Sequence, residues 1–239
     1  VGDEYTKAFE RLGGSMAKIY VSGEIARSDA PDQVIPYSAV KQAQNLDLES
    51  GPSALGVDVA RFGDDDTAFA GLRGGTLPTP ETHSGLDTSR VATLTTEKKQ
   101  ALGCGWDMVG IDTVGIGAGA YDQLPGEAVS IKGGADPVGW QDGRDTEFEF
   151  YDLRSQLWWA LRKALDEGRL ALQDPSQRFV EDLCAPRYSF QREREIRVES
   201  KSDIKPRLGR SPDLGDAATY VNGLTELILQ QNDLTFAVV

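Results

Sequence analysis

ALGVDVARFGDDDTAFAGL, from Ala54 to Leu72, reads as two short apolar strands joined by a turn rich in glycine and aspartate. Apolar runs separated by such residues are typical of an antiparallel β-hairpin. Asp58 interrupts the first run, so the pattern predicts a carboxylate inside a buried strand. An unpaired buried carboxylate is costly. The rest of the chain must therefore supply a partner that neutralises Asp58.

The composition limits what that partner and the whole chain can be. The 239 residues are enough for one large domain or two small ones, and 39% hydrophobic with 26% charged residues is ordinary for a globular protein. One histidine, His83, and two cysteines without CxxC spacing disfavour a zinc site and Ser-His-Asp or Cys-His catalysis. No apolar run approaches the length of a bilayer span and no signal peptide opens the chain, so we expect no membrane partner.

Charge is unevenly distributed along the chain. The net charge of −13 disfavours a general nucleic-acid binder, because phosphate contacts require lysine and arginine. Between Arg187 and Arg210, however, eight Lys/Arg face four Asp/Glu, a local charge of +4. This segment is the one part of the chain whose charge favours contact with phosphates.

The pattern of elements predicts an α/β fold with a mixed central sheet flanked by helices. Residues 1–50 contain few apolar residues and are interpreted as a connector, 51–232 as the main domain and 233–239 as a tail. A capping box over Thr146–Glu149 predicts the start of an amphipathic helix. RYSFQREREIRVES, from Arg187 to Ser200, alternates and predicts a second hairpin.

Acidic residues stand at the ends of three predicted elements. Asp58 lies in the first strand, Asp112 at the carboxyl end of a later strand, and Asp213 and Asp216 in the first turn of the last helix, where residues three apart share a face. Gathered carboxylates repel unless a cation neutralises them, and hard oxygen ligands select Mg²⁺ or Mn²⁺. Two such ions, about 3.5–4 Å apart, can cleave a phosphodiester. Asp64 can return across the hairpin as an auxiliary ligand.

Each of these acids also has a simpler interpretation. Turn amides or Arg61 could satisfy Asp58, the Asp-Asp-Asp turn could be solvated, and Ser-Pro-Asp before the last helix could serve only as a cap. The basic segment has the same ambiguity, because its hairpin charges could pair across strands. The alternative is that the segment holds DNA phosphates with seven side chains: Arg192, Arg194, Arg197, Lys201, Lys205, Arg207 and Arg210.

The motifs GVDVARFGDDDTA, VGIDTVGIGAGAYDQL and ESKSDIKPRLGRSPDLGDA resemble the nuclease domain of bacteriophage large terminase subunits. That resemblance implies an RNase H-like fold of the RuvC/integrase superfamily and Mg²⁺- or Mn²⁺-dependent cleavage of double-stranded DNA during genome packaging, with two ions expected. By resemblance, Asp58, Asp112 and Asp213 match the catalytic acids and Asp64 an additional acid of some members. We expect Asp213 to bind metal directly and Asp216 to support it, although the motif leaves the choice between them open.

The resemblance also implies partners. The family's large subunits begin with an ATPase domain, and the chain contains no GxxxxGK[ST] loop, so we expect an ATPase domain in cis and no ATP hydrolysis by this chain itself. A portal protein, a small terminase subunit and a place in the host cytoplasm rather than the mature virion are further expectations. Alternatives are a RuvC-like junction resolvase, an actin-like phosphotransferase domain and a non-catalytic scaffold.

Overall fold

The computed structural model describes residues 30–48, 50–60, 66–138, 148–192 and 194–236, with side chains as far as Glu226. Its main sheet has five strands in the order β4, β2, β1, β5, β6. In chain order these strands are β1 (Ala54–Asp58), β2 (Thr67–Leu72), β4 (Glu81–His83), β5 (Val109–Asp112) and β6 (Val129–Ile131). The β4–β2–β1 half is antiparallel and the β1–β5–β6 half is parallel, which confirms the predicted mixed sheet.

The register of the central strands brings two of the predicted acids together. Strand β1 pairs antiparallel with β2, as the hairpin predicted, and Asp58 lies opposite Ala68. On its other side β1 pairs parallel with β5, with Val57 opposite Ile111. The next residues along the two strands are Asp58 and Asp112. Both carboxylates therefore stand at the same edge of the sheet, where parallel neighbours end.

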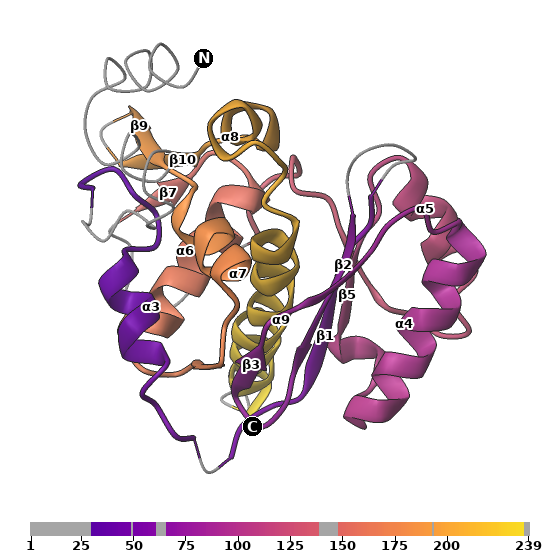
Figure 1. Cartoon of the computed structure of the whole chain (residues 1–239). Helices are drawn as coiled ribbons and strands as arrows, with labels where there is room; N and C mark the ends of the chain where they lie inside the picture. The colour runs from indigo at the N-terminus through magenta and orange to yellow at the C-terminus, as the bar shows by residue number, and fades with distance from the viewer. Residues whose placement is uncertain (1–29, 49, 61–65, 139–147, 193, 237–239) are drawn as a thin grey trace.

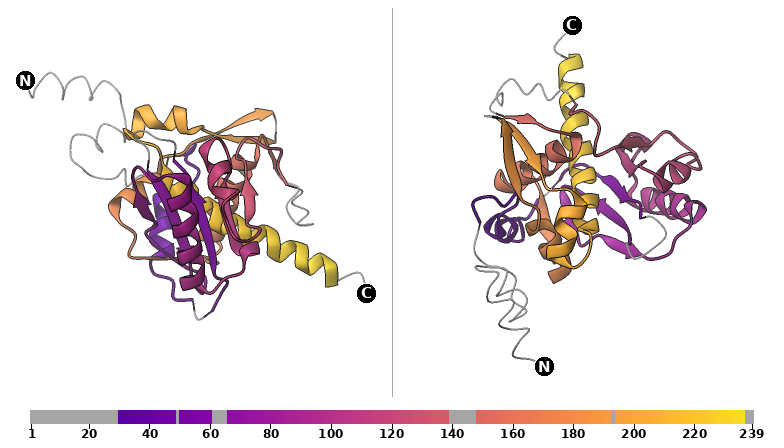
Figure 2. Two further views of the ribbon diagram at one scale, coloured as in Figure 1. Left: turned by 90° about the vertical axis from the view of Figure 1, so that its right-hand side faces the viewer. Right: turned by 90° about the horizontal axis from the view of Figure 1, so that it is seen from above.

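Helices cover both faces of the sheet (Figure 1). On one face lie α4 (Thr88–Leu102) and α5 (Ile116–Tyr121), and on the other lies α9 (Asp213–Phe236), whose C-terminal part projects beyond the body (Figure 2). Beyond α9 lie α3 (Tyr37–Ala43), α6 (Leu153–Asp166) and α7 (Gln177–Cys184). None of the described helices is long and apolar enough to cross a membrane.

Helix α9 packs directly on strand β1 because Gly56 has no side chain. A Cβ at Gly56 would lie 2.3 Å from the carbonyl oxygen of Ala217 and 2.8 Å from the amide nitrogen of Val221, closer than real Cβ atoms come. This close approach places the first turn of α9, with its two aspartates, beside the carboxyl end of β1. The glycine of the opening motif thus sets the distance between two parts of the site.

Smaller elements complete the fold around the main sheet. A three-stranded sheet contains β7 (Glu149–Phe150), β9 (Tyr188–Arg192) and β10 (Glu195–Val198), which confirms the second hairpin. The next segment is the helix α8 (Lys201–Leu208), which begins with a capping box between Ser200 and Asp203. Two short parallel strands, β3 (Thr76–Pro78) and β8 (Ala171–Gln173), and the 3₁₀ turn η1 (Trp106–Met108) complete the list.

Three predicted segments can be compared with the structure. Part of the connector predicted over residues 1–50 packs on the main domain, since Val34, Ile35 and Val40 are fully buried in its core. Helix α6 begins at Leu153 after the N-cap Asp152, while the latter part of the predicted capping box lies in β7. Helix α9 continues through Phe236, so the predicted tail is helical over most of its length. Residues 1–29 of the predicted connector lie outside the described residues.

Candidate functional site

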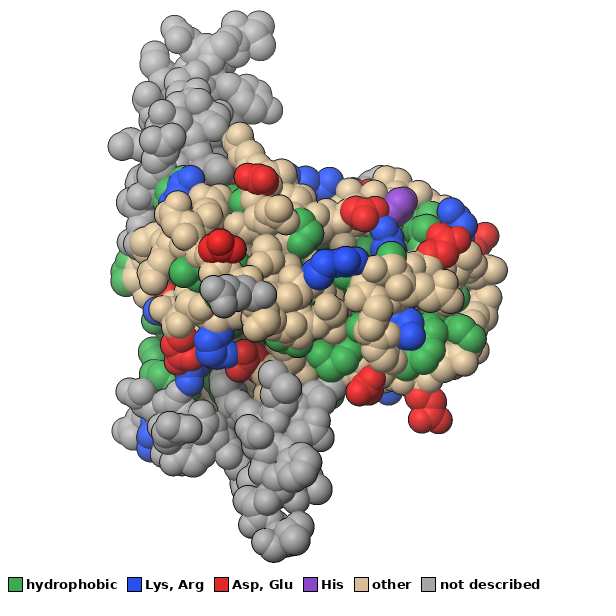
Figure 3. Space-filling model, turned by 90° about the horizontal axis from the view of Figure 1, so that it is seen from below, with side chains coloured by type: hydrophobic (Ala, Val, Ile, Leu, Met, Phe, Trp, Pro, Cys, Tyr) green, Lys and Arg blue, Asp and Glu red, His purple; other side chains and the backbone are tan. Residues whose placement is uncertain are grey.

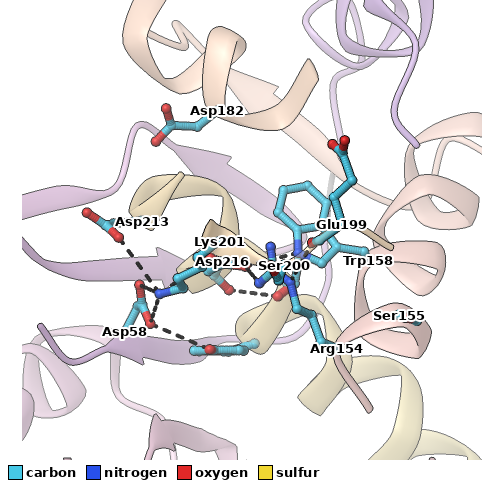
Figure 4. Close-up of polar contacts among 12 residues, drawn as sticks. Asp58, Arg154, Ser155, Trp158, Asp182, Glu199, Ser200, Lys201, Asp213 and Asp216 are labelled. Atoms are coloured by element: carbon cyan, nitrogen blue, oxygen red, sulfur yellow. Dashed lines mark hydrogen bonds and ion pairs between the residues drawn. The ribbon is translucent and has the colours of Figure 1, made fainter. Parts of the chain in front are cut away.

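Three carboxylates from two elements surround the ammonium group of Lys201 (Figure 4). Lys201 Nζ lies 2.9 and 2.7 Å from the two oxygens of Asp58, at the end of β1. The same nitrogen is 3.8 Å from Asp213 Oδ1 and 3.4 Å from Asp216 Oδ2, both in the first turn of α9. Lys201, which the sequence assigned to DNA contact, is therefore the partner that neutralises Asp58.

The lysine lies on the solvent side of the cluster. The side chains of Asp58, Asp213 and Asp216 are 2%, 5% and 0% exposed, whereas 36% of the Lys201 side chain is exposed. Lys201 is also the first residue of α8, so its position depends on a single surface helix. A movement of this one side chain would open the carboxylates to a cation from solution.

Asp112 completes the acid cluster from strand β5. Its Oδ1 accepts a hydrogen bond of 2.8 Å from the amide of Val114. Burial raises the pKa of Asp112 and this hydrogen bond opposes the shift, while the charge of Lys201 lowers the pKa and that of Asp216 raises it. Asp112 thus belongs electrostatically to the same cluster as the other three acids.

The environment of Asp58 disfavours its charge. Burial raises the pKa of Asp58 to about 6, in spite of the opposing charge of Lys201, and the charges of Asp216 and Asp112 add to the rise. Tyr220 lies beside Asp58, with its hydroxyl 3.5 Å from Oδ1. Burial raises the pKa of Tyr220 well above its usual value, so its hydroxyl stays protonated and donates. The ionised form of Asp58 therefore destabilises the folded, metal-free protein.

Asp216 is held from the opposite side by two residues of helix α6. Its Oδ1 accepts hydrogen bonds from Arg154 Nη1 and, at 3.0 Å, from Trp158 Nε1. Burial raises the pKa of Asp216, but the charges of Arg154 and Lys201 and the Trp158 hydrogen bond outweigh it and hold the pKa below its usual value. Neither Arg154 nor Trp158 was among the predicted site residues, and no local sequence signal connects them to Asp216.

Asp182 fixes the start of helix α9 and was also not predicted. This fully buried carboxylate of α7 accepts a hydrogen bond of 3.2 Å from the amide of Leu214 and one of 2.7 Å from Arg210. Burial raises the pKa of Asp182 to about 7, although the charge of Arg210 acts against the rise. Figure 4 shows Asp182 apart from the Lys201 cluster. By accepting from the amide of Leu214, Asp182 stabilises the N-terminus of α9.

The seven predicted DNA-contact residues occupy three different environments. Lys201 lies within the acid cluster. Arg207 pairs with Glu199, and Arg210 pairs with Glu181 and Asp182, so both hold protein elements together. The remaining four, Arg192, Arg194, Arg197 and Lys205, have exposed side chains on the β9–β10 hairpin or helix α8.

The aspartate turn after β1 contributes only one described residue. Asp64, the predicted auxiliary ligand, lies outside the described residues together with Asp65 and Arg61. Asp66 accepts hydrogen bonds from Ser84 and Arg178, at 2.5 and 3.1 Å. The hydrogen bond from Ser84 lowers the pKa of Asp66, and Arg178 adds to this effect, so Asp66 forms a surface ion pair.

The cluster has the donor chemistry of a site for a hard divalent cation. Among the described residues, no three acidic, histidine or cysteine side chains stand ready to hold a metal without rearrangement, and Lys201 Nζ lies between the acids. Asp216 Oδ2, however, is buried and has no hydrogen-bond partner. Carboxylate oxygens are the ligands that Mg²⁺ and Mn²⁺ prefer. The residues that could hold such an ion are Asp58, Asp112, Asp213 and Asp216.

The fold is shared with known phage proteins. A lysine-to-alanine variant of the nuclease domain of the large terminase subunit gp2 of bacterial virus Sf6, with manganese and β-thujaplicinol, superimposes with a TM-score of 0.66 at 19% identity, over 79% of this chain and 97% of that chain. The large terminase nuclease from thermophilic phage G20c with bound magnesium gives a TM-score of 0.53 at 18% identity, over 83% of this chain and 98% of that chain.

The unsubstituted Sf6 nuclease domain gives a TM-score of 0.64 at 18% identity, over 79% of this chain and 97% of that chain. No protein-family model and no curated protein sequence matches the chain. At these identities the likeness establishes the fold, which is RNase H-like as predicted from the sequence.

Proposed function

We propose that this chain is the nuclease domain of a phage large terminase subunit and cleaves double-stranded DNA with the help of Mg²⁺ or Mn²⁺. The observation that carries the proposal is the convergence of Asp58, Asp213 and Asp216 on one cation position, now held by Lys201 Nζ, with Asp112 on the neighbouring strand. The shared fold supports it, since the structural neighbours are terminase nucleases and some carry manganese or magnesium.

The metal requirement follows from the donor set. The four acids supply only hard oxygen ligands, and Asp216 Oδ2 is a buried oxygen without a hydrogen bond. A bound divalent cation there would polarise the phosphodiester and help to activate water, and a pair of ions would clamp both sides of the bond. The acids hold the cation, while Tyr220 donates to Asp58 and Trp158 donates to Asp216. Two ions are our expectation.

Lys201 keeps the acids together until a metal arrives. Its charge offsets the repulsion among Asp58, Asp213 and Asp216, and its exposed stem gives it a route out of the cluster. With Lys201 withdrawn, the acids carry an excess of negative charge that matches one or two divalent ions. The lysine therefore competes with the metal for the same position.

Metal binding is expected to depend on pH through Asp58. Its pKa of about 6 in the folded chain means that a proton competes with the cation below that pH and not above it. We expect Mn²⁺ affinity, measured by calorimetric titration, to fall up to about tenfold per pH unit below about pH 6 and to level off above about pH 7. An affinity that stays constant from about pH 5 to pH 8 would contradict the assignment of Asp58 as a ligand.

We expect the exposed arginines of the hairpin to contact the DNA that is cleaved at the acids. The β9–β10 hairpin and helix α8 stand at the edge of the fold that carries the cluster (Figure 1), and the Arg192 side chain is 80% exposed. The face seen from below shows basic and acidic side chains interspersed on its described part (Figure 3). A mixed surface of that kind gives DNA no continuous positive path, so we place the duplex on the hairpin side.

Reversing two of these charges tests the DNA path. Arg194→Glu combined with Arg197→Glu is expected to weaken binding by at least about tenfold on every sequence, and to reduce the slope of log K against log salt by about two. Fluorescence anisotropy at several salt concentrations measures both quantities. The matched control is Arg73→Glu with Lys99→Glu, at the opposite end of the sheet. Unchanged affinity with altered cleavage positions would show that the hairpin is not a phosphate clamp.

The proposed function implies partners in a DNA-packaging complex. We place it in a packaging protein whose ATPase domain precedes it in cis, with the portal protein and the small terminase subunit as further partners in the host cytoplasm. The support for the ATPase domain is the resemblance of VSGEIARSDAPDQVIPYSAVKQA, residues 21–43, to the family's connector between the ATPase and nuclease domains. We expect no ATP hydrolysis by this chain alone, because it has no phosphate-binding loop of the GxxxxGK[ST] type.

Plasmid digestion tests the proposed function. Supercoiled plasmid is incubated with the chain and Mn²⁺, Mg²⁺ or EDTA, alongside a synthetic four-way junction. We expect nicked and then linear plasmid with either metal, no product with EDTA and no preference for the junction. Cleavage that survives EDTA would overturn the metal mechanism. Cutting confined to the junction would assign the chain to the resolvases instead.

A further inference from the structure

Arg154 contacts the acid cluster from inside the protein. It is the second residue of helix α6, and its Nη1 donates to Asp216 Oδ1 (Figure 4). The same oxygen accepts the 3.0 Å hydrogen bond from Trp158 Nε1, so two donors occupy it. Both donors come from helix α6, four residues apart and therefore on the same face. Asp216 Oδ1 therefore has no remaining role as a ligand in this arrangement.

The second oxygen of Asp216 is left for the cation. Asp216 Oδ2 is buried, has no hydrogen-bond partner, and lies 3.4 Å from Lys201 Nζ. A buried carboxylate oxygen without a donor is costly unless a charge faces it. The arrangement thus turns one edge of the carboxylate to helix α6 and the other edge to the cation position.

Arg154 itself is held in place by three further contacts. Its Nε donates to the carbonyl of Glu199 at 3.2 Å, and its backbone amide donates to the carbonyl of Gly133 at 2.9 Å. The guanidinium stacks over the Trp158 ring, 5.6 Å from its centroid. Glu199 lies two residues before Lys201, so Arg154 ties together Asp216 and the segment that carries the competing lysine.

We propose that Arg154 is a positioning residue that orients Asp216 so that only Oδ2 faces the bound divalent cation. This inference rests on the proposed metal-dependent function and adds a residue to it. Partners behind metal ligands typically change affinity by about 10–100-fold when they are removed. Arg154 acts through Asp216 and needs no contact with the metal or with DNA.

Removal of Arg154 is expected to weaken metal binding, whereas the loss of its positive charge alone would strengthen it. Arg154 is a cation close to a cation site, so a purely electrostatic role means that its removal strengthens metal binding. A positioning role means the reverse, because Asp216 Oδ1 then keeps only the hydrogen bond from Trp158, and the carboxylate is held less firmly in its preferred orientation. Mn²⁺ affinity therefore separates the two explanations, and calorimetry measures it without any cleavage assay.

The experiment compares Arg154→Met with Arg154→Lys and with the matched control Arg162→Met. Arg162 lies two turns along the same helix, stacks over Trp159 at 4.8 Å and pairs with Asp166. We expect Mn²⁺ affinity to fall about 10–100-fold in Arg154→Met and to stay unchanged in Arg162→Met. Arg154→Lys keeps the charge but cannot reach two acceptors with one planar group, so we expect it to bind less tightly than wild type. If Arg154→Met does not fold, the affinity of Arg154→Lys still tests the proposal.

A double mutant decides whether Arg154 acts through Asp216. In an Asp216→Asn background, Arg154→Met is expected to change Mn²⁺ affinity no further, because the pair forms one unit. Additive losses, or an affinity that rises or stays constant in the single Arg154 variants, would overturn the inference. Failure of the wild-type chain to bind Mn²⁺ would instead overturn the proposed function. The two failures are thus distinguishable in one set of titrations.

Discussion

Asp58→Asn is expected to abolish DNA cleavage and, at the same time, to raise the melting temperature of the metal-free protein. The loss follows because the variant removes a ligand charge from the centre of the cluster, and a catalytic metal contributes several kcal/mol, which corresponds to a loss of about 10³-fold or more. The gain in stability follows because asparagine has nearly the shape of the carboxylic acid and carries no charge to bury.

The pKa of Asp58 gives the sign and the pH range of that gain. The value rises from 3.8 to about 6 on folding, so the ionised form is disfavoured in the folded state. Below about pH 4 the residue is protonated in both states and contributes nothing. The cost grows as the pH rises through this interval and is complete above about pH 6, where it amounts to about 2–3 kcal/mol. The variant should therefore melt several degrees higher at neutral pH.

Asp66→Asn is the matched control for Asp58→Asn. Asp66 lies just before β2, but its pKa is lowered by the hydrogen bond from Ser84 and by Arg178. Its replacement is expected to leave cleavage intact and to lower stability slightly rather than raise it. Thermal melts at about pH 4 and pH 7, together with plasmid digestion, measure both effects. An inactive Asp58→Asn protein that is also less stable at neutral pH would indicate a structural role for Asp58.

Lys201→Met is expected to change stability and metal affinity in opposite directions. Without the lysine, three buried carboxylates lose the counter-charge of Lys201, although Asp216 keeps that of Arg154. We expect a loss of about 2–3 kcal/mol, below the range for fully buried pairs because the lysine is partly exposed. The melting temperature should drop by about 5–10 °C without metal. Mn²⁺ affinity should rise by at least about tenfold, since the competing cation is gone.

Metal should therefore restore the stability of the Lys201 variant more strongly than that of the wild type. A ligand stabilises the folded state in proportion to the logarithm of its concentration over its dissociation constant, so tighter binding gives a larger shift. Lys205→Met, one turn along the same helix and exposed, should leave the Mn²⁺ affinity unchanged and lower the melting temperature far less than Lys201→Met does. A variant of Lys201 that binds Mn²⁺ more weakly than wild type would show that the lysine supports the metal instead of competing with it.

The sequence contained enough local information to predict the elements that carry the acids. Two apolar runs and the turn residues between them predicted the β1–β2 hairpin, and an apolar run before a glycine-rich turn predicted a strand that ends at Asp112. The Ser-Pro-Asp signal predicted the start of the last helix, with Asp213 and Asp216 on its first turn. Each of these signals involves residues close together in the sequence, so it can be recognised without knowledge of the fold.

The contacts that finish the site could not be predicted from such signals. Arg154 and Asp216 are 62 positions apart, Lys201 and Asp58 are 143 apart, and only the packing of α6 and α8 against α9 and β1 brings them together. Positive charge in the Arg187–Arg210 segment predicts phosphate contacts at Arg207 and Arg210, and it gives no sign that these side chains pair with Glu199, Glu181 and Asp182 in the folded chain. The composition of a segment shows that charged side chains are present, but tertiary packing decides which partners they have.

The location of a bound Mn²⁺ ion tests the central claim most directly. Crystals of the chain soaked in Mn²⁺ and measured near the manganese absorption edge give an anomalous signal that marks the ion independently of the protein atoms. We predict a peak among the carboxylates of Asp58, Asp112 and the first turn of α9, with Lys201 Nζ moved away from its present position. A Mn²⁺ peak outside this cluster, with Lys201 still bound to Asp58 and the chain active under the same conditions, would contradict the account.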